Sequence, residues 1–438
     1  MGAGAFIEPG VVVFLLFGGT WINRTRSSDR SHRQPYHSGK RDDTPGGLES
    51  GEHSPTRETD SLLSQSHGSE QGDGWQRREF RLAGWTKEVR TPDTSVFEDR
   101  LLSRLLVKLP FLVEVWYWAL VYWVYQLGRA FTAVTLVQGT VYTARRHALQ
   151  VIHLEQALGI FHERAFQEFF RSYPTLMHWI NRIYSFIHIP GTILFLVGLY
   201  YYTIVSNRVS TLPRSRSGSP ARPAGSPAGP ALYEARRRTM AVCNLIAFVI
   251  FTLWPCMPPR LLSDPGYKGP DAKEAKGYGF VDTVHGSSGE SSVWTQNKFC
   301  NQYAAMPSLH FGYSLLVGLT IMTIPLAPRR STSVVFGTGK FSLRIPAWRR
   351  LIAVFVGFLY PAIILVAIVA TANHFILDAV AGAVVCGLAW NANAVLLNLL
   401  PLEDWFLYAL RLHKPRVQAQ AEAFPDEKIV RQSVVLDS

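Results

Sequence analysis

The chain has 438 residues, of which 47% are hydrophobic and 17% are charged, and its formal net charge is +12. Its apolar residues are gathered in long blocks separated by polar stretches, which excludes a chain of soluble domains alone and indicates a polytopic membrane protein. Its four cysteines are too few for a disulfide framework, and no CxxC or Cys/His pattern suggests a zinc site.

The basic excess does not indicate nucleic-acid binding. Most of it lies in short loops beside the apolar blocks, where Lys and Arg orient a membrane protein against anionic lipid. Because no basic module interleaved with aromatic residues occurs, we expect no nucleic-acid partner.

Residues 1–104 are expected to form a disordered polar region. The VVVFLLF segment within residues 1–21 is too short to span a membrane, so a start-site artefact, a weak signal segment and a short tethering helix stay open, and no stable span is expected. From residue 22 to about 104 the chain has few large apolar residues before Trp75, so it cannot bury enough surface to fold.

Six blocks have the length of about 20 mainly apolar residues that a transmembrane helix requires. They are residues 109–127, 186–206, 239–257, 308–327, 351–372 and 375–400. We therefore predict an all-α membrane domain of about six transmembrane helices over residues 105–405, followed by a cytosolic tail over residues 406–438.

Three features within this domain carry further expectations. Glu114 lies near the end of the first span and is expected to snorkel or to pair, with a functional acid as the alternative. Residues 141–171 alternate charged with apolar positions at helical spacing, which predicts a helix on the membrane or over the bundle. Residues 207–238 contain five prolines among Gly, Ser and Arg, which predicts a disordered linker.

Loop charges predict the topology. The loop over residues 207–238 has seven Arg and one Glu, and the loop over residues 328–350 has six basic residues and no acid, so both should be cytosolic. The loop over residues 259–304 has five basic and five acidic residues and belongs on the outer or lumenal side. Two arginines at 145 and 146 disagree with an outside location of residues 128–185, but that loop is long enough for the rule to weaken.

This topology brings four polar side chains to one membrane face. Arg260 follows the third span in WPCMPPR, His310 opens the fourth in MPSLH, and His374 and Asp378 join the last two spans in TANHFILD. On a helix, His374 and Asp378 would share one face, and an ionised Asp inside a membrane helix costs about 3 kcal/mol, so it should have a partner. Ser308 can cap the helix that carries His310.

The chemistry of this set fits phosphoryl transfer through a phospho-histidine. Arg offers fixed cationic donors to phosphate oxygens, His is a nucleophile or an acid near neutral pH, and a carboxylate can orient an imidazole and stabilise its charged form. Each motif alone is a modest signal, and its order and convergence favour a catalytic site over unrelated buried polar residues.

At these residues the sequence resembles the type-2 phosphatidic acid phosphatase superfamily, and most closely its inositol phosphorylceramide synthase (inositolphosphotransferase) branch. The resemblance covers roughly residues 110 to 400. It is carried by IHLEQALGIF at 152–161, PPRLL at 258–262, YAAMPSLHFGYS at 303–314 and NHFILDAVAG at 373–382.

The resemblance implies a role for each site residue. His374 would attack the phosphorus, Asp378 would orient it, His310 would protonate the leaving oxygen, and Arg260 with Ser308 would bind the phosphate. It implies no metal and no organic cofactor. It also implies membrane lipids as partners, with a phosphatidylinositol-type donor and a ceramide-type acceptor, and a site on the lumenal face of an internal membrane such as the Golgi.

The sequence departs from the phosphatase pattern at several positions. Leu253 stands where that pattern has a Lys, Leu309 replaces a Gly, and Ala367 and Ile368 replace a Ser-Arg pair. Fewer phosphate-binding cations argue for a phosphodiester donor and so favour the synthase branch.

Other functions remain as alternatives. A lipid phosphate phosphatase or phospholipase C-like hydrolase would use the same site, with water in place of the lipid alcohol. Two histidines and a carboxylate could also hold the iron of an oxygenase, but membrane hydroxylases need more clustered histidine. A lipid scaffold or transporter would leave the four convergent groups unexplained.

Cys256 and Cys300 border the loop that leads from Arg260 to His310. In a compartment that permits disulfides, a bond between them would hold the phosphate-binding Arg beside the general acid. Two unrelated buried thiols are the equally open alternative, because sequence alone gives neither the Cα separation nor the side-chain directions.

Overall fold

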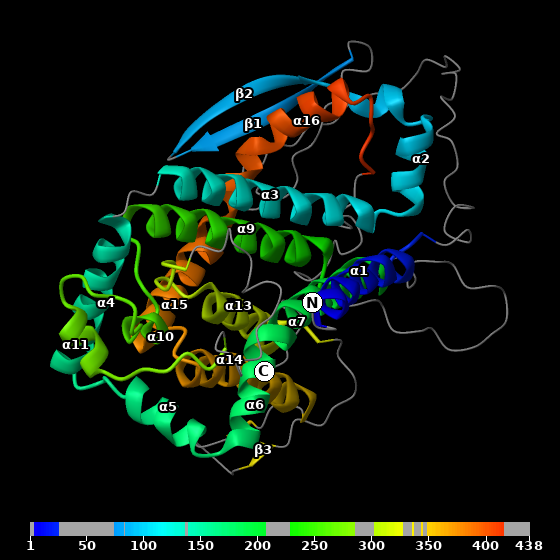
Figure 1. Ribbon diagram of the computed structural model, residues 1–438. Helices are drawn as coiled ribbons and strands as arrows, with labels where there is room; N and C mark the ends of the chain where they lie inside the picture. The colour runs from blue at the N-terminus through cyan, green and yellow to red at the C-terminus, as the bar shows by residue number, and fades with distance from the viewer. Residues whose placement is uncertain are drawn as a thin grey trace, which may run out of the picture.

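The computed structural model describes residues 4–25, 74–82, 84–135, 139–206, 228–284, 302–326, 335–336, 343–344 and 348–415. These residues are mainly helical (Figure 1). In chain order the named elements are α1 (Gly4–Ile22), β1 (Trp75–Leu82), β2 (Trp85–Pro92), α2 (Leu101–Lys108), α3 (Phe111–Thr135), α4 (Gly139–Ala157), α5 (Glu163–Arg171), α6 (Pro174–Arg182), α7 (His188–Tyr200), α9 (Pro230–Leu253), α10 (Pro259–Leu262), α11 (Ala272–Gly277), α13 (Leu309–Thr323), β3 (Val335–Phe336), β4 (Leu343–Arg344), α14 (Trp348–Ala370), α15 (Ile376–Ala392) and α16 (Leu400–Ala409).

Helix α13 lies at the centre of the bundle and packs against α7, α9, α14 and α15. Glycines bring its backbone close to that of its neighbours at two places. A methyl group on Gly382 of α15 would collide with the carbonyl oxygen of Ser308, and one on Gly318 would collide with that of Gly357 in α14. These contacts require glycine because only a residue without a side chain lets two helix backbones approach so closely.

The described helices include three that are long and apolar enough to cross a membrane. They are the continuous helical runs Pro174–Val205, Trp348–Ala370 and Ile376–Ala409. A fourth span results if Leu101–Lys108 and Phe111–Gly128, which meet at an angle of 99°, are taken together. The prediction of a helical membrane protein is thus confirmed, whereas six spans are not.

The two other predicted spans differ from expectation for identifiable reasons. Helix α9 begins at Pro230 and so includes three consecutive arginines at 236–238, which lower its apolar character. Helix α13 has 15 residues, which at about 1.5 Å per residue is shorter than a hydrocarbon core of about 30 Å. It ends before Ile324, whose extended backbone (ψ 130°) is the conformation that the following Pro325 favours.

The expectation of a disordered N-terminal region is wrong for the parts that the structure describes. Strands β1 and β2 form an antiparallel hairpin in which Leu82 pairs with Trp85 and Trp75 pairs with Pro92. Gly84 in the tight turn has φ +84°, which glycine adopts without strain. The VVVFLLF segment, for which no stable span is expected, lies in helix α1, which packs against α7. The apolar part of α1, Pro9–Ile22, is shorter than a span.

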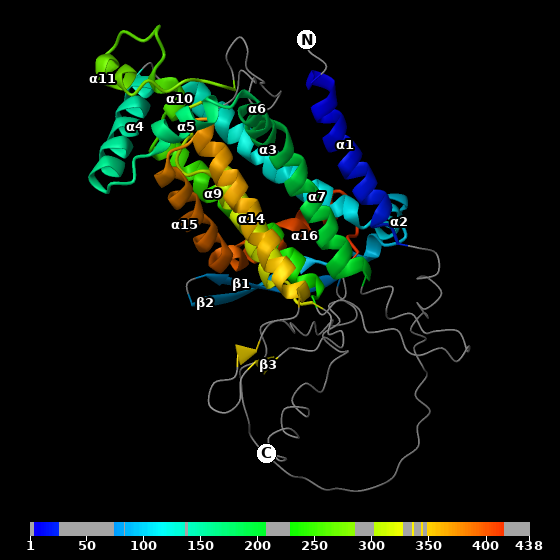
Figure 2. The same cartoon turned by 90° about the horizontal axis from the view of Figure 1, so that it is seen from below.

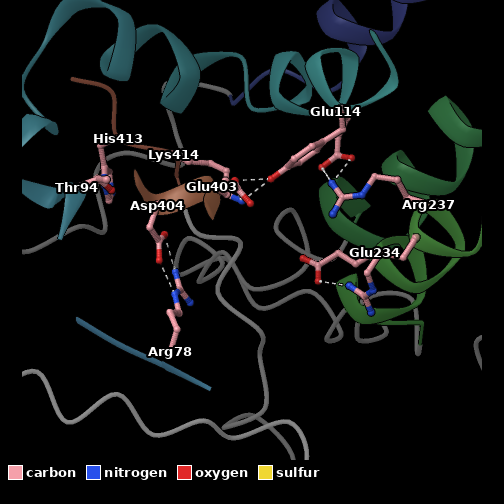
Figure 3. Close-up of polar contacts among 11 residues, drawn as sticks. Arg78, Thr94, Glu114, Glu234, Arg237, Glu403, Asp404, His413 and Lys414 are labelled. Carbon is pink, nitrogen blue, oxygen red and sulfur yellow. Dashed lines mark hydrogen bonds and ion pairs between the residues drawn. The ribbon is translucent and has the colours of Figure 1, made fainter. Parts of the chain in front are cut away.

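The hairpin is attached to the C-terminal helix α16 by a buried ion pair (Figure 3). Arg78 donates from Nε and Nη2 to the carboxylate of Asp404 at 2.8 and 3.1 Å, and Thr91 donates to the same carboxylate at 2.9 Å. Trp75 also meets Trp405 edge to face. An isolated hairpin is marginally stable in water, so these tertiary contacts hold it.

Glu114 of α3 pairs with Arg237 of α9, as its position near a helix end predicts (Figure 3). Both carboxylate oxygens accept from Arg237 Nη1, at 2.8 and 2.7 Å. Since both side chains are mostly buried, the pair ties α3 to α9 within the bundle.

The bundle has two distinct ends (Figure 2). Helices α4, α5, α10 and α11 lie at one end, and the hairpin with α16 lies at the other. Residues 141–171, predicted to be helical, form α4 and α5 with a break after Ala157. The end that carries α10 also receives the start of α13 and the connection between α14 and α15.

Candidate active site

The four residues predicted to form the site lie together at this end. Arg260 lies in α10, His310 is the second residue of α13, Asp378 is the third of α15, and His374 lies in the connection before α15. The backbone N–H of Arg260 donates to the carbonyl of Ala372 in that connection at 2.9 Å, and the ring centroids of His310 and His374 are 5.7 Å apart. The structure thus brings the four residues together, while their roles stay predictions.

The prediction that His374 and Asp378 share a helix face is wrong in its geometry. Helix α15 begins at Ile376, and Phe375 caps it with an extended backbone. The carboxylate of Asp378 reaches back, and its Oδ2 accepts from the N–H of Phe375 at 2.8 Å. Ala372 in the same connection has φ +53°, a strained conformation for a residue with a side chain. The spacing of four residues therefore serves a helix cap that brings the carboxylate beside His374.

His374 is held by its Nδ1 atom. This atom lies 2.8 Å from the carbonyl oxygen of Ala305 and 3.5 Å from Oδ2 of Asp378. A carbonyl oxygen only accepts, so Nδ1 carries the proton and the lone pair of the neutral ring lies on Nε2. Nε2 is therefore the atom from which His374 can attack an electrophile.

Asp378 supplies a buried negative charge behind this imidazole. Its side chain is 0% exposed, and its Oδ1 has no hydrogen-bond partner among the described residues. Because the Ala305 carbonyl makes the shorter contact with Nδ1, orientation of His374 is shared between that carbonyl and the carboxylate. The carboxylate additionally favours any positively charged form of the ring.

His310 lies against other aromatic side chains. Its ring stacks on Tyr184 at 4.7 Å and lies 5.2 Å from the ring of His188, whose Nδ1 is 2.9 Å from the hydroxyl of Tyr360. His188 and Tyr184 were not among the predicted site residues. The sequence signal for His188 is an ionisable residue inside an apolar run. Tyr184 lies in the π-helical turn Ile183–Ile187, a feature frequent at functional sites.

Arg260 is fixed by two side chains from different segments. Its Nε donates to Oδ1 of Asn373 at 2.8 Å, and its Nη1 donates to Oδ2 of Asp282 at 2.9 Å. Thr371 in turn accepts from the amide of Asn373 at 2.8 Å. The guanidinium is thus attached to the connection that carries His374, which gives it a fixed position relative to that histidine.

Ser308 is fully buried and caps α13. Its hydroxyl accepts from the N–H of Phe311 at 3.4 Å, and its own N–H donates to the carbonyl of Asp378 at 2.9 Å. The predicted capping role is thus observed, whereas contact with a phosphate stays a prediction.

Two glutamates cap the helix that carries Asp378. Neither was among the predicted site residues. Glu155 accepts from the N–H of Leu377 at 2.8 Å, and Glu163 accepts from that of Ile376 at 2.9 Å. Both side chains are 0% exposed, and burial together with the neighbouring Glu163 raises the pKa of Glu155 to about 9. Glu155 lies in the IHLEQALGIF motif at 152–161, and this motif is the sequence feature that could have indicated a role for it.

Helix α4 also supports α10. Arg145 is 2% exposed, and its guanidinium donates to the carbonyl oxygens of Leu262 and Leu261 at 2.6 and 3.3 Å. These hydrogen bonds hold α10 against α4. Arg145 thus has a structural role at this position, which explains why a basic residue occurs in a loop predicted to lie outside.

Of the two cysteines in the predicted disulfide, Cys256 is fully buried. Cys300 lies outside the described residues, so the bridge stays a prediction. The backbone of Cys256 has a role of its own, because it accepts from Ala305 N–H at 3.0 Å and donates to Tyr303 at 2.8 Å. It thereby fixes the segment whose carbonyl holds His374. Within the described ranges, no three His, Cys, Asp or Glu side chains gather to hold a metal ion.

Comparison with known families identifies one match. The sequence model described as the PAP2 superfamily matches residues 149–211, 228–338 and 340–392, which together make up more than half of the chain. Comparisons with curated proteins and with solved structures find no match. The matched residues include Arg260, Ser308, His310, His374 and Asp378. The chain therefore belongs to the PAP2 superfamily, whose members are phosphatases or phosphotransferases.

Proposed function

We propose that the protein is a membrane phosphotransferase. It moves a phosphoinositol-type head group from a phospholipid to a lipid alcohol such as ceramide, through a phospho-histidine intermediate. The observation that carries the proposal is the His374 imidazole, held at Nδ1 with Nε2 left for attack, beside a second histidine and a fixed arginine.

The first half-reaction forms the phospho-histidine. Arg260 binds the phosphate oxygens and Nε2 of His374 attacks the phosphorus, forming an N–P bond as the bond to the diacylglycerol oxygen breaks. His310, protonated at this stage, gives its proton to that oxygen. The positive charge on the phosphorylated ring is stabilised by the carboxylate of Asp378 at 3.5 Å from Nδ1.

The second half-reaction reverses these roles. His310, now neutral, takes the proton of the acceptor hydroxyl as its oxygen attacks the phosphorus. The N–P bond breaks, His374 regains its lone pair, and His310 is again protonated. Protons and charge are therefore restored after each cycle without an external acid or base.

The positions at which this chain departs from the phosphatase pattern support a phosphodiester donor. Ala367 and Ile368 are apolar and 0% exposed, so no cation approaches the phosphate from those positions. Arg260 is partly neutralised by Asp282, with which it forms an ion pair. A site with so little positive charge suits a donor with one negative charge.

The proposal also covers the membrane in which the protein lies and the side on which its site opens. Family membership and the apolar helices indicate a membrane protein. We assign the site to the lumenal face of an internal membrane such as the Golgi, because the loop over residues 259–304 lacks the basic excess of the cytosolic loops.

The test is incubation of purified protein with head-group-labelled phosphatidylinositol, with and without ceramide. Labelled lipid that forms only with ceramide supports transfer, whereas release of a water-soluble labelled head group without ceramide identifies the runner-up, a hydrolase. His374→Ala and Asp378→Asn should each lower turnover at least about 100-fold, the size of effect expected for positioned catalytic groups. His153→Ala is the matched control, since His153 is an exposed histidine of α4.

A further inference from the structure

From the contacts of Arg260, we infer that Asp282 sets the charge selectivity of the phosphate site, so that a phosphodiester monoanion binds in preference to a phosphomonoester dianion. The inference rests on the proposed role of Arg260 in binding phosphate. It does not depend on whether water or a lipid alcohol is the final acceptor.

Asp282 contacts the guanidinium directly. Its Oδ2 lies 2.9 Å from Nη1 of Arg260, and the two side chains are 23% and 9% exposed. The bonds to Asp282 and Asn373 use two of the five guanidinium N–H groups, and the remaining ones can reach a phosphate. A phosphate bound there has the Asp282 carboxylate as a near neighbour.

The position of Asp282 is built into the fold. Its Oδ1 accepts from the N–H of Val284 at 3.0 Å. Gln167 of α5 donates to the carbonyl of Val281 at 2.8 Å and accepts from its N–H at 3.1 Å. On the other side, the amide of Asn181 donates to the carbonyl of Thr283 at 3.2 Å. The residues before and after Asp282 are therefore both attached to helices, which prevents the carboxylate from moving away when an anion arrives.

The charge of the guanidinium is already offset in part. The Asp282 carboxylate lies 2.9 Å from Nη1 and compensates the single positive charge of Arg260. A phosphodiester brings one negative charge, whereas a phosphomonoester brings up to two near neutral pH. The second charge meets Asp282 at short range, which should weaken monoester binding about tenfold or more.

A purely structural role for Asp282 makes a different prediction. If the carboxylate only orients Arg260, its removal weakens binding of monoesters and diesters by the same factor. The two roles are therefore separated by the ratio of the two affinities, and a loss of activity alone would not separate them.

The experiment measures stabilisation of the purified full-length protein in detergent by methyl phosphate and by dimethyl phosphate, at a pH where methyl phosphate is a dianion. Wild type should require a concentration of methyl phosphate about tenfold higher than of dimethyl phosphate for half of the maximal rise in melting temperature. In Asp282→Asn, the methyl phosphate requirement should fall by about tenfold more than that of dimethyl phosphate, because the dianion loses twice the repulsion that the monoanion loses. Asp264→Asn is the matched control, because Asp264 belongs to the same loop and bonds Gly266.

Several outcomes would overturn the inference. Wild type that binds methyl phosphate as tightly as dimethyl phosphate contradicts it even if no variant can be purified. Equal changes for both ligands in Asp282→Asn would leave Asp282 as a structural partner of Arg260 alone. No stabilisation by either ligand would remove Arg260 as a phosphate-binding residue, a failure distinct from that of the ceramide assay.

Discussion

Replacing Glu155 with Gln should change the pH dependence of stability more than stability itself. Three consecutive N–H groups at the start of α15 each donate to an acidic side chain, that of Asp378, Glu163 and Glu155 in turn. Burial and the neighbouring Glu163 raise the pKa of Glu155 to about 9, so the native protein keeps a proton there at neutral pH. The amide of Gln can accept from Leu377 and donate to Glu163, as a protonated Glu155 does.

The sign of the effect follows from where the proton is bound. In the unfolded chain Glu155 loses its proton near its ordinary pKa of 4.5, whereas the folded protein keeps it to about pH 9. Between these values the folded state binds more protons, so the free energy of unfolding falls as pH rises, by up to about 1.4 kcal/mol for each pH unit. Gln has no proton to lose, so the variant lacks this contribution.

The change in the free energy of unfolding with pH is large enough to measure by thermal unfolding. Over about two pH units above neutrality, wild type should lose up to about 3 kcal/mol relative to Glu155→Gln, or roughly 6 °C in melting temperature at about 2 °C per kcal/mol. Glu155→Ala should instead be destabilised by about 1–3 kcal/mol at every pH, because it leaves the buried N–H of Leu377 without an acceptor.

The assay compares apparent melting temperatures of the purified protein in detergent across pH. Glu168→Gln is the matched control, because Glu168 lies on α5 and its side chain is 68% exposed. The reasoning is refuted if the difference between Glu155→Gln and wild type stays constant with pH, or if the variant becomes relatively less stable as pH rises.

Three further predictions follow from other contacts. Arg260→Lys should lower activity nearly as much as Arg260→Ala, because an ammonium cannot keep the bonds to Asn373 and Asp282 while it binds phosphate, and wild-type activity in the Lys variant would contradict this. Asp404→Asn should lower the free energy of unfolding by about 1–3 kcal/mol in thermal scans, whereas Glu88→Gln, in an exposed ion pair, should cost less than about 1 kcal/mol. Protease protection should find a tag within residues 209–231 on the cytosolic side and one within residues 285–290 on the other, and both tags on one side would contradict the predicted topology.

The local motifs could be predicted from sequence because each is contiguous. In MPSLH, the same few residues cap a helix and carry the histidine at its start, so the pattern indicates both structure and chemistry. The resemblance to the superfamily is confirmed by the family match, and the ordering of the motifs along the chain is what brought Arg260, His310 and His374 into one prediction.

Groups that join distant segments could not be found in this way. Glu155 and Leu377 are 222 residues apart, and Arg78 and Asp404 are 326 residues apart. A glutamate such as Glu155 on α4 has the same local sequence whether its side chain faces water or caps another helix. The hairpin was missed for the same reason, since its stability depends on α16 and not on its own composition.

What the sequence by itself determined is the class of protein, a helical membrane protein of the PAP2 superfamily, together with the prediction that His310, His374 and Asp378 belong to its site. The length of an apolar block and the residues of a contiguous motif depend only on neighbouring positions, so both can be recognised from the sequence. The tertiary structure decided the state of those groups. It alone places the Ala305 carbonyl on Nδ1 of His374, Asp282 on Arg260 and two buried glutamates on the start of α15, because the energy of a buried hydrogen bond or ion pair depends on partners that folding brings from elsewhere.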